Sequence, residues 1–306
     1  MTARPRRPAT GAALVAAMLV AALAAAVVAA LASSQSQWFR SVELRRDQVQ
    51  AQALVLAGLA WARQVIQLDS RAGPIDHLGE PWALPLPPTP LDNGSIEGRI
   101  VDAQGRLNLN NLAIDGAPAR GERARLARLF ARAGIAAASL EALADWIDAD
   151  EIPRDGGGES AAYAATGRAP ANAPLVRSAE ATLARGIDEP HFALLAELVT
   201  ALPVTTTLNV NTASPEVLAS AVNGLEGDAL ASLVDGRTRK PFASVAEFRS
   251  RLPAGTSIED DTTIGVRSDF FVVTVRARQG ETVAQGRALL RRRGDDMPAV
   301  VWQTVE

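Results

Sequence analysis

The hydrophobic pattern begins with a long uncharged run. From Ala12 to Ala32 the chain contains only Ala, Leu, Val and one Met. A transmembrane helix needs about 20 mostly apolar residues, so this run can cross a bilayer. No Pro or Gly interrupts the chain between Ala12 and Ala57, and further apolar residues return at helical spacing: Trp38, Val42, Val49, Leu56 and Leu59. The pattern predicts one continuous helix over residues 12–70, with residues 12–32 in the membrane and an amphipathic half carrying a globular body.

The next two segments have the patterns of a linker and of strands. Residues 71–94 are rich in Pro, which fixes φ and removes a backbone donor, so we predict an extended linker. Residues 95–112 predict a β-hairpin with its turn at residues 102–105, as the first part of a sheet. Strand alternation returns in residues 261–306. The two strand regions are therefore expected to form one antiparallel sheet.

Between the strand regions the apolar period becomes helical. Residues 113–205 predict a helical insert, in which two helices starting near Pro118 are separated at Gly134. Ser139 is the expected cap of the second helix, and more helix is predicted within residues 175–202, with a break at residues 186–190.

Residues 206–260 have a separate helical pattern. Ser214 is an expected N-cap followed by Pro215 at the first helical position. The short turn that follows resembles a helix-hairpin-helix module, which is best known from DNA-binding proteins. Its hairpin carries Glu226 and Asp228, and carboxylates repel phosphate. We therefore interpret it as a structural or protein-contact module.

Composition excludes several classes of site. The 306 residues include no Cys, which excludes disulfides, thiol catalysis and cysteine metal sites. The two histidines, His77 and His191, are far apart and have no partner motif, which disfavours a zinc site or a catalytic triad. The net charge of −3 shows no excess of positive charge of the kind that is typical of nucleic-acid-binding proteins. The Arg291–Arg293 run is interpreted as a solvated strand end, with an anionic partner as the alternative.

One segment has candidate chemistry. Residues 145–159 contain six carboxylates on a Gly-rich loop at a helix end. Such carboxylates repel one another unless a hard cation binds, and Ca²⁺ takes about 6–8 oxygen ligands from flexible loops. A solvated acidic loop and a catalytic carboxylate pair are the alternatives. The candidate calcium ligands are Asp148, Asp150, Asp155 and Glu159, with Glu151 next.

The N-terminus resembles a type IV prepilin signal. Three arginines precede Gly11, and the apolar run starts at the next residue. The resemblance implies that a prepilin peptidase cuts between Gly11 and Ala12 and methylates the new terminus. Most members have Glu at the fifth mature position, where this chain has Ala16. That departure is a trait of the K-type minor pseudopilins of type II secretion, the general secretion pathway protein K family. A plain membrane anchor and a secretory signal cleaved after Ala32 are the competing interpretations.

Further segments are similar to that family. They are the Trp146-x-Asp148-x-Asp150 loop, Tyr163, Asn172-Ala173-Pro174, Gly105–Asn110 and Leu208–Ser214. The resemblance implies an α+β fold, with a type IV pilin-like long N-terminal helix on an antiparallel sheet. It also implies a large helical insert that contains helix-hairpin-helix (SAM-like) modules. In this family the insert is expected to bind calcium. The expected organisation is a leader (1–11), a long helix (12–70), a linker (71–94), first strands (95–112), an insert (113–205), a second module (206–260) and last strands (261–306).

The resemblance also implies a function. The expected protein is not an enzyme; it caps the pseudopilus tip and helps start assembly for protein export. Its expected partners are the minor pseudopilins I, J and H, the prepilin peptidase and the inner membrane, with no nucleic acid. It would cross the inner membrane once, with its C-terminal body in the periplasm. A membrane-anchored DNA-uptake protein and a periplasmic hydrolase remain as rival functions.

Overall fold

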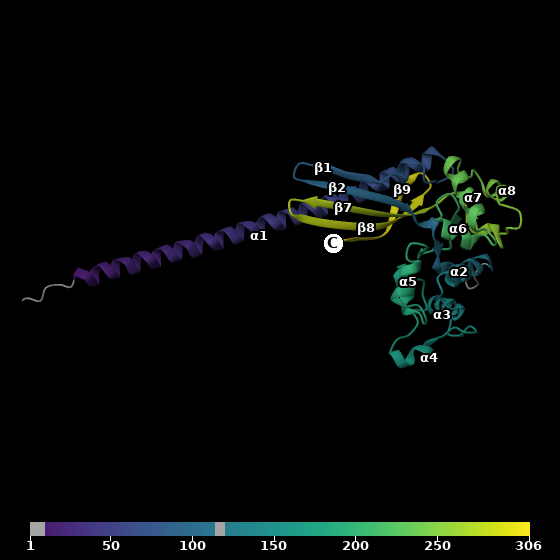
Figure 1. The fold of residues 1–306 in the computed structure, drawn as a ribbon, viewed down its shortest axis with the longest axis horizontal. Helices are drawn as coiled ribbons and strands as arrows, with labels where there is room; N and C mark the ends of the chain where they lie inside the picture. The colour runs from purple at the N-terminus through teal and green to yellow at the C-terminus, as the bar shows by residue number, and fades with distance from the viewer. Residues whose placement is uncertain (1–9, 114–119) are drawn as a thin grey trace, which may run out of the picture.

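A computed structural model describes residues 10–113 and 120–306. The basic leader at residues 1–9 and the predicted helix start at Pro118 lie outside the described residues. Helix α1 runs without interruption from Thr10 to Ala72 (Figure 1). It ends directly before Gly73-Pro74, where proline disfavours a helical conformation of the preceding residue. The predicted continuous helix is confirmed.

The C-terminal half of α1 packs on the sheet, while the half before it is exposed. Its buried face carries Ala51, Val55, Leu59, Ala62 and Ile66. Only one residue of the apolar series predicted from the sequence, Leu59, belongs to this face. The other members of that series are exposed: Trp38, Val42, Val49 and Leu56. The helix buries a face that includes alanines, because small side chains allow its backbone to approach the strands closely.

The sheet has five antiparallel strands in the order β1-β2-β7-β8-β9. The predicted linker contains an edge strand, β1, and an edge position tolerates its prolines because no ladder donor is needed on the open side. The hairpin predicted with a turn at residues 102–105 was also wrong, because the observed hairpin joins β1 to β2. Those residues instead form a short 3-10 helix capped by Asp102, which accepts a hydrogen bond from Gln104 N (2.7 Å). The strands are β1 (Leu86–Leu91), β2 (Gly94–Asp102), β7 (Phe270–Gln279), β8 (Thr282–Arg293) and β9 (Asp296–Val305).

The insert between β2 and β7 is mostly helical and lies at the end of the sheet far from the N-terminus of α1 (Figure 1). Its short strands pair in parallel, β3 (Leu107–Asn108) with β4 (Val199–Thr200) and β5 (Leu208–Asn209) with β6 (Ile264–Gly265). A separate hydrophobic core holds the insert together. Its helices are α2 (Arg120–Arg132), α3 (Ala137–Ile147), α4 (Ser160–Tyr163), α5 (Glu189–Leu195), α6 (Pro215–Ala221), α7 (Gly227–Arg239) and α8 (Val245–Ser250).

Two of the predicted helix signals in the insert are confirmed, one is confirmed in part and one is wrong. Gly134 separates α2 from α3, and Ser214 caps α6 by accepting a hydrogen bond from Val217 N (3.3 Å). Ser139 is not a cap, because α3 begins before it and its hydroxyl donates to Gly186 O (3.2 Å). Within residues 175–202, a 3-10 helix (Ser178–Leu183) and the short helix α5 lie on either side of the predicted break, but a strand, β4, follows where more helix is predicted. Helices α6, α7 and α8 occupy the region of the predicted helix-hairpin-helix module, which itself stays a prediction.

Buried asparagines hold the insert together and connect it to the sheet. Asn110 donates to Leu175 O (2.9 Å) and Leu202 O (3.0 Å). Asn209 donates to Asp76 O (3.1 Å) and to Asp102 Oδ2 (2.9 Å). Both asparagines are fully buried, so each satisfies backbone or carboxylate groups that would otherwise lack a partner. The first of these Leu-Asn-x-Asn segments therefore connects parts of the insert to one another, and the second connects the insert to the end of β2 and to the segment after α1.

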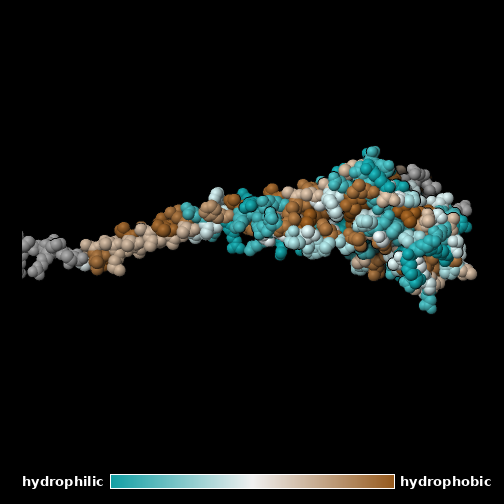
Figure 2. Space-filling view, turned by 90° about the horizontal axis from the view of Figure 1, so that it is seen from above, coloured by the Kyte–Doolittle hydropathy of each residue, from teal (hydrophilic) through white to brown (hydrophobic). Residues whose placement is uncertain are grey.

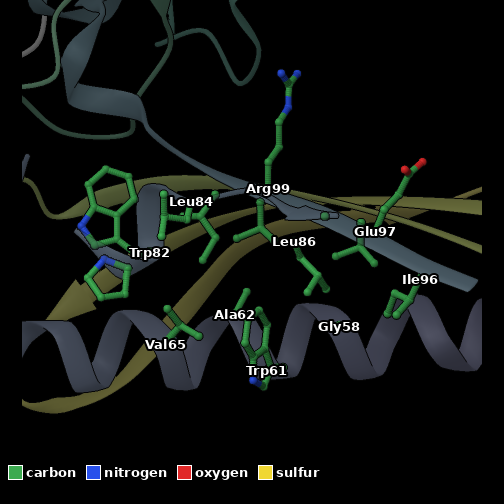
Figure 3. Close-up of a pocket in the computed structure, with 15 residues that line it drawn as sticks. Gly58, Trp61, Ala62, Val65, Trp82, Leu84, Leu86, Ile96, Glu97 and Arg99 are labelled. Carbon is green, nitrogen blue, oxygen red and sulfur yellow. The ribbon is translucent and has the colours of Figure 1, made fainter. Parts of the chain in front are cut away.

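Gly58 lies on the side of α1 that faces the sheet (Figure 3). A Cβ atom there would lie 2.8 Å from Val275 Cγ1 and 3.1 Å from Ile96 Cδ1. Alanine raises helix propensity by about 1 kcal/mol, but overpacking a core costs about 1–3 kcal/mol. We expect Gly58→Ala to lower the melting temperature of the full chain in detergent. Gly236→Ala in α7, where a Cβ meets nothing within 4 Å, is the control and should not lower it. If Gly58→Ala and Gly236→Ala changed the melting temperature equally, the contact between Gly58 and Val275 would not be tight.

Candidate metal centre

Three acidic side chains converge at the turn between α3 and α4. Asp145 lies in the last turn of α3, Asp148 caps its C-terminus, and Glu159 is the N-cap residue of α4. Each offers a carboxylate oxygen, and these oxygens lie within 4.8 Å of one another. All three residues are buried. The loop between α3 and α4 therefore folds back, so that three negatively charged side chains lie close together inside the insert.

The loop is folded tightly around Asp145. Asp145 Oδ2 accepts hydrogen bonds from Gly158 N (2.8 Å) and Arg154 N (3.0 Å). A Cβ atom on Gly157 would overlap this oxygen, so the close approach requires glycine. The Arg154 guanidinium pairs with Asp145 (2.6 Å) and with Asp148, which supplies one positive charge.

One arginine leaves part of the negative charge unbalanced. Asp148 Oδ1 and both carboxylate oxygens of Glu159 are buried and have no hydrogen-bond partner. Burial, and then the charges of Asp145 and Asp148, raise the pKa of Glu159 to about 7. Burial also raises the pKa of Asp148, although Arg154 acts against this shift. Unpartnered carboxylate oxygens are the ligands of hard divalent cations, so this cluster could hold a metal ion.

The other candidate ligands lie outside this cluster. Asp150, Glu151 and Asp155 are exposed. Asp150 Oδ1 accepts from Ile152 N (2.8 Å), and Glu151 Oε1 accepts from Asn172 Nδ2 (2.9 Å). Of the five candidate ligands predicted from the sequence, the structure thus brings only Asp148 and Glu159 together.

Sequence reasoning had not selected Asp145 as a ligand. The signal that could have found it is its spacing of three residues from Asp148, since residues three apart on a helix are neighbours.

The other motif residues of the loop support its shape. The rings of Trp146 and Tyr163 meet edge to face with centroids 5.1 Å apart. Asn172 adopts a positive φ of 45°, and its backbone N–H donates to Trp146 O (3.1 Å). These contacts hold the segment that follows α4 against the end of α3, beside the carboxylates.

A second acidic group already has a cation. Oxygens of Asp69, Asp76 and Glu80 also lie within 4.8 Å of one another. The Arg292 guanidinium contacts Asp69 at 2.6 Å and Asp76 at 2.8 Å. Glu80 is also partnered, because its Oε2 accepts a hydrogen bond from His77 N (2.8 Å), so we do not consider this group a metal centre.

The predicted processing residues lie at the start of α1. Gly11 and Ala12 are both exposed in its first turns. Among the described residues, α1 alone is long and apolar enough to cross a membrane, with a mean hydropathy of 2.8 in its most apolar window. None of that window is buried, and Figure 2 shows the apolar surface along the free part of the helix. This segment is a candidate membrane anchor.

Two family models cover much of the chain. Both carry the description "Type II secretion system (T2SS), protein K", and they match residues 105–204 and 208–267. The type II secretion system protein K of Pseudomonas aeruginosa is 33% identical over 234 residues, which are 70% of this chain and 68% of that protein. The chain belongs to the type II secretion system protein K family. As a member of this family it is a minor pseudopilin of type II secretion.

Other relatives agree with this assignment. The Pectobacterium carotovorum protein K is 30% identical over 216 residues, covering 66% of each chain. A chain in the crystal structure of the GspK-GspI-GspJ complex from enterotoxigenic Escherichia coli is 24% identical and superposes with a TM-score of 0.76. That match covers 87% of this chain and 99% of the other. It confirms the predicted α+β fold, with the long helix, the antiparallel sheet and the helical insert in the same arrangement.

Proposed function

We propose that the chain caps the tip of a type II secretion pseudopilus and helps start its assembly. The observation that supports this is the position of the insert. Helices α2 to α8 lie beyond the end of the sheet that is far from the N-terminus of α1 (Figure 1). A further subunit added in the direction away from the membrane would meet this bulk instead of a free helix. The role is non-enzymatic and needs no nucleic acid.

The exposed part of α1 supports assembly with other pseudopilins. Its large apolar side chains face solvent, including Trp38 at 61% and Val49 at 66% exposure. Exposed apolar stripes on a helix are buried when helices pack side by side. The Escherichia coli complex contains GspI and GspJ, and we propose minor pseudopilins I, J and H as the partners here. Ala16 fits the tip position, because a subunit with none above it has no neighbouring amine to neutralise.

Co-purification tests this proposal. The full chain in detergent should form a complex with pseudopilins I and J that contains one copy of it. Val42→Glu places a charge on the exposed apolar face of α1 and should weaken that complex. Ser41→Glu adds the same charge at the neighbouring exposed position and is the control. Absence of any complex, or repeated incorporation of this chain into a filament, would contradict the tip role.

We propose processing by the prepilin peptidase between Gly11 and Ala12. The exposed start of α1 and the apolar run behind it support this site. Mass spectrometry of the protein from cells with the peptidase should give a methylated N-terminal Ala12, followed by an anchored helix and a periplasmic body. A chain that begins at Ser33 would show a cleaved secretory signal, and an uncut chain would show a plain anchor.

We also propose that the acidic cluster of Asp145, Asp148 and Glu159 binds a calcium ion. Asp145, Asp148 and Glu159 supply only oxygen ligands, and the unpartnered oxygens can accept a hard cation. Calcium would supply the positive charge that Arg154 does not, and would hold the end of α3 to the start of α4. The exposed Asp150, Glu151 and Asp155 contribute less in this proposal, because they are not part of the buried group.

A further inference from the structure

A polar cleft separates the pilin sheet from the helical insert. Its volume is about 430 Å³. The sheet wall is the face turned away from α1, because alternate residues of β8 such as Ala284 and Ala288 pack in the core under the helix. The opposite wall comes from the residues around β3, β4 and η5 (Ser178–Leu183). Volumes of roughly 300–1,000 Å³ are typical of binding pockets.

Positive charge dominates the walls of this cleft. Arg106, Arg177 and Arg287 line it, and Glu306 at the end of β9 is the single acidic residue among the described lining residues. Arg106 pairs with Glu197 at the rim. Within the described chain, Arg177 and Arg287 make no side-chain hydrogen bond or ion pair. The chain as a whole has a net charge of −3, so this excess of arginine is local.

The positive region continues across the sheet. Arg287 of β8 is opposite Thr274 of β7, which is opposite Arg99 of β2. Residues at one register level share a face, so Arg99 extends the same row. Burial lowers the pKa of Arg106, Glu197 opposes this, and the charges of Arg99 and Arg287 lower it further. Arg106 and Arg287 line the same cleft, so their like charges repel each other, and a carboxylate between them would relieve that repulsion.

The floor of the cleft is apolar. Val272, Leu289 and Trp302 follow one another at the next register level of β7, β8 and β9. An apolar floor below an arginine rim suits a ligand with both apolar and carboxylate groups. A nucleic-acid backbone has no apolar groups for this floor and would leave it uncovered.

We infer that this cleft binds an extended acidic segment of another protein, in which carboxylates alternate with apolar side chains. Successive side chains of an extended segment point to opposite sides. The apolar side chains then contact Val272 and Trp302, while the carboxylates meet Arg177 and Arg287. Planar guanidiniums bind carboxylates with two parallel hydrogen bonds, which favours arginine here.

Fluorescence anisotropy with the full chain in non-ionic detergent tests this inference. The probe is a fluorescein-labelled peptide of alternating glutamate and valine, and the control peptide has glutamine instead of glutamate. We expect saturable binding of the acidic peptide only, weakening as salt rises. Arg177→Gln and Arg287→Gln should each weaken binding about 3- to 5-fold, and the double variant about tenfold.

Arg278→Gln is the matched control. Arg278 is an exposed arginine on the same strand as Thr274, near the far end of the sheet and outside the cleft. Its replacement should leave peptide affinity within about 2-fold. Melting temperatures of all variants should stay unchanged, because these side chains are exposed. The inference is overturned by equal binding of the glutamine peptide, by equal loss in Arg278→Gln, or by tighter arginine-dependent binding of an oligonucleotide.

Discussion

Removing calcium with a chelator is expected to lower the melting temperature of the full chain, and Asp148→Asn is expected to abolish that response. An ion that binds only the folded state stabilises it by about 2.7 kcal/mol at 100 times its dissociation constant. For a unit of this size that corresponds to a shift of about 5 °C or more. The physical reason is the unbalanced charge of the cluster, where Asp148 Oδ1 and both Glu159 oxygens are buried without partners.

Asp155→Asn is the matched control for this experiment. It removes the same charge from the same loop, but Asp155 is exposed and outside the buried group. Melting curves with calcium and with chelator should differ for the native chain and for Asp155→Asn, and should coincide for Asp148→Asn. Glu159→Gln should behave like Asp148→Asn. Curves that coincide for the native chain would remove the calcium proposal, and a lost response in Asp155→Asn would move the site to the exposed carboxylates.

The main architecture follows from strong one-dimensional patterns. The uninterrupted apolar run predicts α1, and the period-two alternation after Ile264 predicts β7 and β8. Patterns of this kind depend only on residues close in sequence. The buried face of α1 could not be predicted in the same way, because it includes alanines such as Ala51 and Ala62, while Trp38 and Val49 remain exposed. Which face is buried depends on the strands that approach it, and these are more than 200 residues away in β7 and β8.

Only part of the candidate site could be predicted from the sequence, for the same reason. The density of carboxylates in residues 145–159 identifies the loop, but not which oxygens converge. Convergence depends on the close approach of Gly157 to Asp145 and on Arg154, whose backbone and side chain both bind that carboxylate. The prediction from the sequence considers only the carboxylates of this loop and leaves out Arg154, which helps to bring them together.

The Arg291–Arg293 run shows how strand geometry changes an interpretation. It was interpreted as a solvated strand end, and this is confirmed for Arg291 and Arg293, which are exposed. It is wrong for Arg292, which is 4% exposed. Side chains alternate along β8, so the middle arginine points to the same side as Leu290. The alternation was visible in the sequence, but an arginine in the core becomes plausible only when its partners are known.

Arg292 joins the end of α1 to the rest of the body. Its guanidinium contacts Asp69 in the last turns of α1 and Asp76 in the segment that follows. It also donates to Ser268 O (3.1 Å) and lies 4.8 Å from the centroid of the Phe271 ring. Asp76 in turn accepts from Ser268 N (2.7 Å). One buried cation therefore connects the helix, the sheet and the start of β7.

Arg292→Met is expected to lower the free energy of unfolding by about 3–5 kcal/mol, because it leaves buried carboxylates without a cation. Arg293→Met removes an exposed arginine at the next position and should change the free energy by less than about 0.5 kcal/mol. Chemical unfolding of the full chain in detergent gives both values. Adding Asp69→Asn and Asp76→Asn to Arg292→Met should recover part of the loss, because the unpaired charges are then gone. A loss in Arg292→Met that the added changes do not reduce would mean that packing against Phe271, and not charge pairing, is what holds α1 in place.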